Sequence, residues 1–220
     1  MVWPGTHTVV VPNPDLKPEK SLNYEAGSSF KADGVFGSDD HLFAKAVFFY
    51  DDVKDFIAPK GWFEPTTPPT VYYSSQNVGH VVRKGIELSG TYAAGQFSTS
   101  VSYGLLHAVD KETNERMNGI TPQSANLKLA YAFPAQAINV WYRAHWSKGG
   151  ESSVEDRATG KNLHFSSFLT HSLGAEWSPK VADLANLQAG IAVVNLFDKE
   201  YRMLNGSYGS GRGVWLSAQF

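Results

Sequence analysis

The last ten residues of the chain, positions 211–220, alternate between apolar and small or polar side chains and end on the aromatic Phe220. Val214, Leu216 and Ala218 share a face with Phe220, because successive side chains of a strand point to opposite faces. A soluble protein seldom ends on an ordered apolar strand, whereas a membrane barrel can, since its outer face contacts lipid and its closing strand leaves no free edge. The pattern therefore predicts a closing strand whose apolar face contacts lipid.

The composition excludes several other classes of protein. No run approaches the roughly 20 consecutive apolar residues that a membrane-spanning helix needs, so a helical membrane protein is excluded. The chain has no cysteine, which removes disulfide frameworks and thiol chemistry, and its net charge of -2 provides no basic field for nucleic acid. The first residues, Met1–Pro4, lack the basic and apolar regions of a signal peptide. For an exported protein, we therefore expect this start to be a cut or truncation point.

The chain predicts nine strands and almost no helical periodicity. Very short connections, such as Ala94–Gln96 and Pro134–Gln136, alternate with long polar ones, such as Ala58–Thr70 and Gly149–Ser166. This asymmetry is typical of an outer-membrane barrel, with turns in the periplasm and loops outside. The predicted strands are Leu22–Ala32, Leu42–Ile57, Val71–Ala93, Phe97–Val109, Ala125–Phe133, Ala137–Lys148, Ser167–Trp177, Leu187–Phe197 and Gly213–Phe220.

Two of these segments, Ala125–Phe133 and Ala137–Lys148, show the alternation of a barrel strand plainly, with apolar residues that would face lipid and polar residues that would face a lumen. A soluble antiparallel sandwich is the alternative, with its apolar face turned inward. Nine strands cannot form a whole single-chain barrel, which has an even strand number. We therefore expect an all-β protein, an antiparallel transmembrane β-barrel, of which residues 1–220 form a C-terminal segment of about nine strands. The residues predicted to face lipid include Leu127, Leu129, Val140 and Tyr142, and those predicted to face the lumen include Asn126, Lys128, Asn139 and Arg143.

A series of short motifs, in this order along the chain, resembles the TonB-dependent outer-membrane receptors. The resemblance covers residues 13–220. It implies a 22-stranded barrel whose lumen is plugged by an N-terminal domain that is absent from this chain. It also implies import of iron complexes, haem or cobalamin with energy passed through TonB. The motifs are Asn13–Lys20, Tyr24–Gly27, Phe49–Ile57, Asn77–Gly79, Gly85–Leu88, Val194–Tyr201, and Gly211-Arg212 with the terminal Phe220.

The resemblance further implies a location and partners. We expect the bacterial outer membrane, the TonB–ExbB–ExbD system acting through the missing plug, membrane lipid, and an iron or haem ligand or its carrier. The C-terminal strand with Phe220 looks like the signal read by the barrel-assembly machinery. No intrinsic cofactor is expected, and haem or a ferric siderophore is the transported ligand. We expect no enzyme, because Ser, His and Asp occur without a spacing that selects a triad; a passive porin and an outer-membrane barrel enzyme remain the alternatives.

One histidine and several aromatic residues are the candidates for ligand binding. His7 precedes the Asn13 motif, where haem receptors resembling this chain carry an axial histidine, and neutral imidazole is a good ligand for haem iron. The arginine-containing motif usually found just upstream in haem receptors is not in this chain, so haem and a ferric siderophore both stay open. Aromatic rings can stack on a porphyrin or on catecholates, although packing between loops is the alternative role. The aromatic candidates are Trp62, Tyr72, Tyr73 and Tyr208.

Two motifs are expected to build the scaffold. Pro14 and Pro18 restrict the residues before them to extended conformations, so Asn13–Glu19 is expected to lead the chain stiffly into a strand. Asn195–Asp198 is expected to end a strand in a turn.

Overall fold

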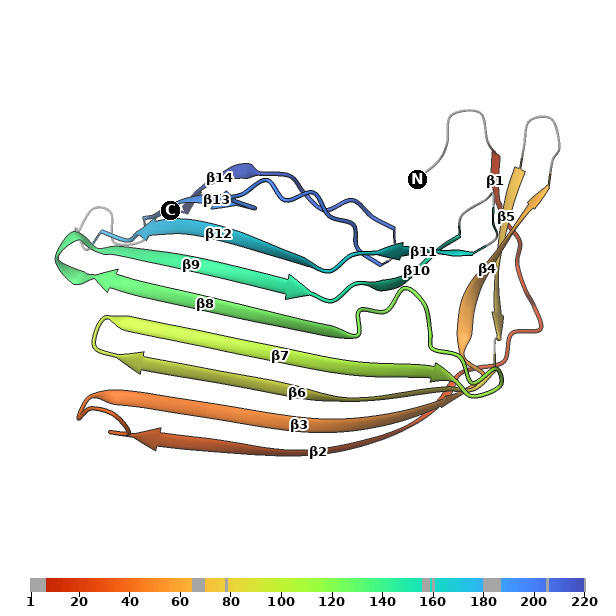
Figure 1. Ribbon diagram of the computed structural model, residues 1–220, viewed down its shortest axis with the longest axis horizontal. Helices are drawn as coiled ribbons and strands as arrows, with labels where there is room; N and C mark the ends of the chain where they lie inside the picture. The colour runs from red at the N-terminus through yellow and green to blue at the C-terminus, as the bar shows by residue number, and fades with distance from the viewer. Residues whose placement is uncertain are drawn as a thin grey trace. The chain divides into compact units, whose positions relative to one another are not determined.

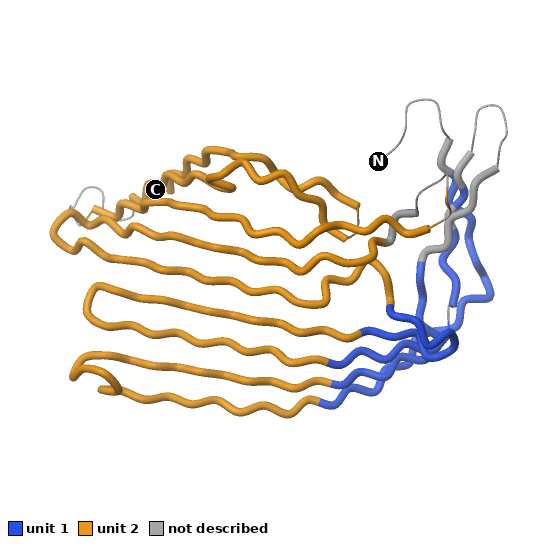
Figure 2. Tube along the Cα trace, in the orientation of Figure 1, with its two compact units in different colours: residues 1–24, 50–84, 108–116 blue, residues 25–49, 85–107, 117–220 orange. Residues whose placement is uncertain are grey.

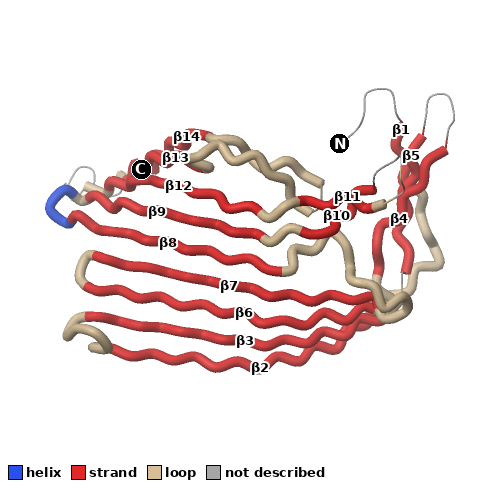
Figure 3. The backbone as a smooth tube through the Cα atoms, in the orientation of Figure 1, coloured by secondary structure: helices blue, strands red, loops and turns tan. Residues whose placement is uncertain are grey.

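The computed structural model describes residues 7–64, 70–77, 79–155, 159, 161–179, 187–204 and 206–219. Strands dominate these residues, and η1 (Pro134–Gln136) is a single short 3-10 turn (Figures 1 and 3). Among the described residues, no helix has the length and apolar character to cross a membrane.

Nine strands form one sheet in the order β14-β13-β12-β9-β8-β7-β6-β3-β2 (Figure 1). Neighbours from β7 to β14 pair antiparallel. The prediction of nine strands in an all-β, antiparallel fold is confirmed. The strands are β2 (Lys20–Asp33), β3 (Asp40–Lys54), β6 (Val81–Ala94), β7 (Phe97–Asp110), β8 (Gln123–Phe133), β9 (Ile138–Ser147), β12 (Phe168–Trp177), β13 (Gln188–Val194) and β14 (Gly213–Gln219).

The sequence prediction was wrong within the long connections. The segment 71–93 is two strands, because Gly79 has a φ of 97° and turns the chain between β5 (Thr70–Asn77) and β6. Asp55, with a φ of 54°, likewise separates β3 from β4 (Ile57–Glu64). The connection Gly149–Ser166 holds a hairpin of β10 (Gly150–Glu155) and β11 (Asn162–Phe165). Each of these connections is long enough to form two strands that pair with each other. A prediction of loops from polarity alone overlooks such strands.

The register between neighbouring strands aligns residues of the same face into rows that cross the sheet. One row joins Leu129, Tyr142, Leu173, Val193 and Val214, which are cross-strand partners from β8 to β14. The residues next along each strand belong to the opposite face. The prediction that apolar and polar residues occupy opposite faces of the sheet is thereby confirmed. Contact of the apolar face with lipid stays a prediction.

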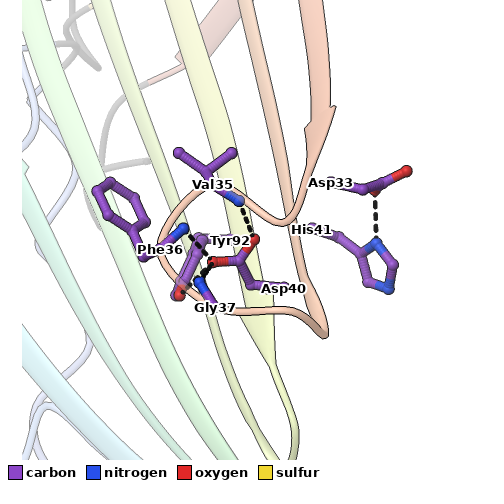
Figure 4. A network of polar contacts seen from close by, with 7 residues as sticks. All are labelled: Asp33, Val35, Phe36, Gly37, Asp40, His41 and Tyr92. Carbon is purple, nitrogen blue, oxygen red and sulfur yellow. Dashed lines mark hydrogen bonds and ion pairs between the residues drawn. The ribbon is translucent and has the colours of Figure 1, made fainter.

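The turn between β2 and β3 is organised around the buried carboxylate of Asp40 (Figure 4). Its oxygens accept hydrogen bonds from the backbone N–H groups of Val35, Phe36 and Gly37 at 2.7–2.9 Å and from the Tyr92 hydroxyl at 3.1 Å. Burial by itself raises the pKa of this carboxyl group, but the hydrogen bonds outweigh burial and hold the pKa below its usual value. The turn lies at the end of the sheet that carries the short connections.

The chain divides into two compact units (Figure 2). Unit 1 is Met1–Tyr24, Tyr50–Lys84 and Ala108–Arg116, and unit 2 is Glu25–Phe49, Gly85–His107 and Met117–Phe220. Each unit has its own few buried apolar residues: Val53, Val81, Val82 and Ala108 in unit 1, and Ala130, Trp141, Phe168 and Leu204 in unit 2.

Candidate functional site

A three-stranded sheet in unit 1 gathers four of the five predicted ligand-binding positions. β1 (His7–Val10) pairs parallel with β5, and β5 pairs antiparallel with β4. His7 lies opposite Thr70, and two residues further along, Val9, Tyr72 and Trp62 form one row across the three strands; Tyr73 lies in the row after that. The side chains of His7, Trp62 and Tyr73 lie outside the described residues, so only their backbone positions are established. Tyr72 is half-buried.

The motif Asn13–Glu19 ties the chain after β1 to β5 and β4. The side chain of Asn13 donates to the backbone oxygen of Ser75 at 3.0 Å. The Asn77 amide bonds Lys17 reciprocally: its oxygen accepts from the Lys17 N–H and its nitrogen donates to the Lys17 carbonyl, both at 2.9 Å. Glu19 accepts from the backbone N–H of Ile57 at 2.6 Å. The motif therefore does more than lead into β2, because it fixes the segment after His7 against the strand that carries Tyr72.

Two ion pairs join β3 to the chain around β6 within unit 1. His80 Nε2 lies 2.7 Å from Asp52 Oδ1, and the Arg83 guanidinium donates to Asp51, with its Nε at 2.9 Å. The Asp51 carboxylate is largely buried. These pairs are structural, because the contacts occupy the carboxylates at the base of the β4–β5 hairpin rather than leaving them to a ligand.

The predicted turn Asn195–Asp198 organises the last long connection of unit 2. Asn195 is 5% exposed, and its amide donates to the carbonyls of Lys199 and Ser210 and accepts from the Lys199 N–H, all at 2.9 Å. Asp198 accepts from the backbone N–H of Arg212 at 2.8 Å. Both Asn195 and Asp198 have positive φ, which Asn and Asp tolerate better than most residues. The prediction of a turn at this motif is confirmed.

This connection closes one side of a hollow of about 760 Å³, the loop pocket, which contains the fifth predicted residue, Tyr208. The Arg202 guanidinium lies over the Tyr208 ring, 4.0 Å from its centroid, and 5.6 Å from the centroid of Phe165, and it also donates to the Tyr208 hydroxyl. Tyr201 stacks on Phe168 with centroids 4.1 Å apart. The loop pocket is lined by His164–Phe168, Asp198–Arg202, Tyr208, Gly209 and Gly211.

The structure thus separates the predicted site residues into two groups. His7, Trp62, Tyr72 and Tyr73 belong to unit 1, Tyr208 belongs to unit 2, and Phe220 lies outside the described residues. The sequence analysis missed Arg202, because a single arginine in a polar loop carries no pattern. It also missed the reciprocal hydrogen bonds between the Asn77 amide and the backbone of Lys17, called the Asn77 clamp below, although Asn77 belongs to the motif Asn77–Gly79. Within the described ranges, no group of three or more histidine or acidic side chains could hold a metal ion.

Comparison with known proteins places the fold in a family. A family model described as "TonB dependent receptor-like, beta-barrel" matches residues 3–196. The chain is 26% identical over 214 residues to the "Heme/hemopexin utilization protein C" of Haemophilus influenzae, with 96% of this chain and 30% of the relative covered. It is 28% identical over 203 residues to the "Vitamin B12 transporter BtuB" of Photobacterium profundum, with 91% and 29% covered.

Solved structures give the same fold. The chain matches the structure titled "Copper transporter OprC" with a TM-score of 0.74 and 20% identity, covering 94% of this chain and 32% of that one. At this identity, the likeness concerns the fold alone. The chain spans about 30% of the length of the curated relatives described above.

Proposed function

Since the chain belongs to the family of TonB-dependent receptor β-barrels, we propose that it is the C-terminal part of a bacterial outer-membrane receptor for TonB-energised uptake of an iron-containing ligand. Residues 1–220 supply nine strands of a larger barrel, and the plug belongs to the remainder of the protein. The TonB–ExbB–ExbD system acts through that plug. The protein is a transporter of its ligand and holds no cofactor of its own.

The observation that carries the proposal is the three-stranded sheet β1-β5-β4. It brings the backbone of His7 into register with the strand that carries Tyr72 and Tyr73, within the long connection that joins β3 to β6. A binding site for a planar ligand needs a metal-binding nitrogen and aromatic faces close to each other. The Asn77 clamp holds this arrangement against the chain that follows β1.

Haem is the first candidate ligand. A relative at 26% identity is named for haem and hemopexin utilisation, and His7 has the chemistry of an axial iron ligand. In this proposal, His7 binds the iron while Trp62 and Tyr72, whose row lies two residues further along the register and so on the same face, contact the porphyrin. Tyr73 belongs to the opposite face of the sheet.

A ferric siderophore is the second candidate, and the loop pocket favours it. Arg202 lies over the ring of Tyr208 and near the ring of Phe165, which keeps a positive charge beside aromatic faces at the long-connection end of unit 2. A guanidinium held in this way suits anionic, ring-bearing chelates of iron.

Titration of the full-length receptor with haemin decides between the candidates. For a haem receptor, haemin changes the absorption spectrum of the wild type, and His7→Ala alters the spectrum and weakens binding. His41→Ala is the matched control, because His41 pairs with Asp33 beside the β2–β3 turn and should leave both unchanged.

A wild type without any haemin-induced spectral change removes haem from the proposal. The siderophore candidate then requires that Tyr208→Ala and Arg202→Gln reduce growth on ferric chelates as the iron source. If neither ligand supports binding or growth, the proposed uptake of iron-containing ligands is wrong.

A further inference from the structure

A row of hydrogen-bond donors crosses four strands on the polar face of unit 2. Ser100 on β7, Lys128 on β8, Arg143 on β9 and Ser172 on β12 are successive cross-strand partners, and Figure 1 shows these strands side by side. We call these four residues the donor row. All of them line one hollow of about 490 Å³.

The donor row places two positive charges directly opposite each other. Lys128 and Arg143 are register partners, and like charges at directly opposed positions destabilise a sheet. Among the described residues, neither of them forms an ion pair with a carboxylate. The two charges therefore have no ion-pair partner in the part of the chain that the structure describes.

The ring of Trp141 supports the side chain of Arg143. Its guanidinium carbon lies 4.4 Å from the centroid of the Trp141 ring. The Trp141 indole N–H donates to Glu176 Oε1 at 3.1 Å, and the ring lies where a Cβ at position 174 would be, a space left open by Gly174. A guanidinium stacked on a fixed ring loses little freedom when it binds a ligand, which favours a preformed site.

The neighbouring row of the same hollow differs, because three of its polar side chains already bond to each other. His145 Nδ1 lies 2.7 Å from Asn126 Oδ1, and Asn126 Nδ2 donates to Ser102 Oγ at 3.1 Å. No hydrogen bond involves the side chains of Ser100 or Ser172 among the described residues. The lysine and the arginine that line the hollow thus both belong to the donor row.

We propose that the donor row is an anion-binding site on the lumen wall that takes a carboxylate group of a small ligand. Arg143 and Lys128 provide the charge, and the hydroxyls of Ser100 and Ser172 donate from either side. The proposal rests on the barrel of the proposed function, because the polar face becomes a lumen wall only when the barrel closes. It goes beyond that function in assigning a second binding site, inside the barrel, and it does not depend on which ligand is taken up.

Thiol labelling of the full-length receptor tests the site without any cargo. The 220 residues contain no cysteine, so Ser172→Cys gives one reactive thiol in this part of the barrel. A negatively charged methanethiosulfonate reagent should modify this thiol about tenfold faster than a positively charged one at low salt, and the preference should shrink as salt is added. In the Lys128→Gln/Arg143→Gln background, the preference should disappear.

Ser217→Cys is the matched reporter. Ser217 lies on the same face, in a row whose charged member is the acidic Glu176, and it should show no preference for the anionic reagent. Citrate should protect the Ser172→Cys thiol, whereas an uncharged amide of similar size should not.

Equal rates for the two reagents, or faster reaction with the cationic one, overturn the proposal. A thiol that reacts with neither reagent also overturns it, because the counter-charge is then a carboxylate of the plug that fills the site permanently. Failure of haemin or siderophore uptake leaves all these labelling rates unaffected, so the two proposals are tested separately.

Discussion

The indole ring of Trp141 on β9 lies directly over Gly174 on β12, its register partner, in the space that a side chain at position 174 would take. Trp141 is 7% exposed and supports the guanidinium of Arg143. The Trp141 ring can occupy this place only because Gly174 has no side chain. The position of the Arg143 guanidinium, which rests on the ring, therefore also depends on Gly174.

A side chain at position 174 should destabilise the sheet. Gly174→Val forces the Trp141 ring out of its place, and overpacking of this kind costs about 1–3 kcal/mol. The thermal unfolding midpoint of the full-length receptor should fall. Gly37→Ala is the control, because a Cβ at Gly37 meets open space. An unchanged midpoint for Gly174→Val contradicts the observed packing.

The buried carboxylate of Asp40 should make stability depend on pH in the acid range. Its pKa is lower in the folded protein than in the unfolded chain, so the unfolded state binds the proton more readily. The stabilisation is fully present above the usual Asp pKa of about 3.9 and is lost as pH falls through the lowered value. Asp40→Asn should lower the unfolding midpoint at neutral pH and flatten its decline below about pH 4. The neighbouring exposed Asp39→Asn should retain the wild-type profile, and identical profiles for all three proteins would exclude this role.

The Asn77 clamp should hold the segment after β1. Asn77→Ala removes two bonds to Lys17 and one to the carbonyl of Asp55, each worth about 1 kcal/mol. Amide hydrogen exchange of residues 13–19 should therefore accelerate by about tenfold or more. Asn162→Ala, which removes one bond to Ser152 in another connection, should leave that exchange unchanged. Slow exchange in Asn77→Ala would show that other contacts hold the segment.

Lipid contact should alternate along β8 and β9. Spin labels at Leu129 and Tyr142 are expected to collide with a lipid-soluble quencher, because both belong to the apolar row. Labels at Lys128 and Arg143, their direct neighbours along the chain, should be shielded by the barrel wall. Equal quenching of the two pairs would contradict the barrel.

Loss of Phe220 should reduce the amount of receptor in the outer membrane. The residue ends the apolar alternation that includes Val214, Leu216 and Ala218, and it looks like the signal read by the barrel-assembly machinery. Deletion should lower outer-membrane abundance, measured by fractionation, and reduce heat-modifiable mobility in gels. Normal values for both would count against an assembly role.

The sequence by itself determined the strands of the large sheet and the faces of each strand. A period of two residues is a local property, visible in any segment such as 125–133 without knowledge of its neighbours. The turn at Asn195–Asp198 was equally readable, because the preference of Asn and Asp for positive φ is a property of the residue itself.

Only the tertiary structure decided which residues meet across strands. Lys128 and Arg143 each look like an ordinary polar position in an alternating strand, and their juxtaposition depends on the register between β8 and β9. The same holds for β1, whose parallel pairing with β5 joins residues more than sixty positions apart. Register is set by the hydrophobic pattern and by turn geometry. A period of two residues excludes a slip by one residue, but it does not choose between registers that differ by two. The sequence therefore predicts the strands and their two faces. The pairing of the strands decides which charged residues and which candidate ligand-binding residues lie next to each other.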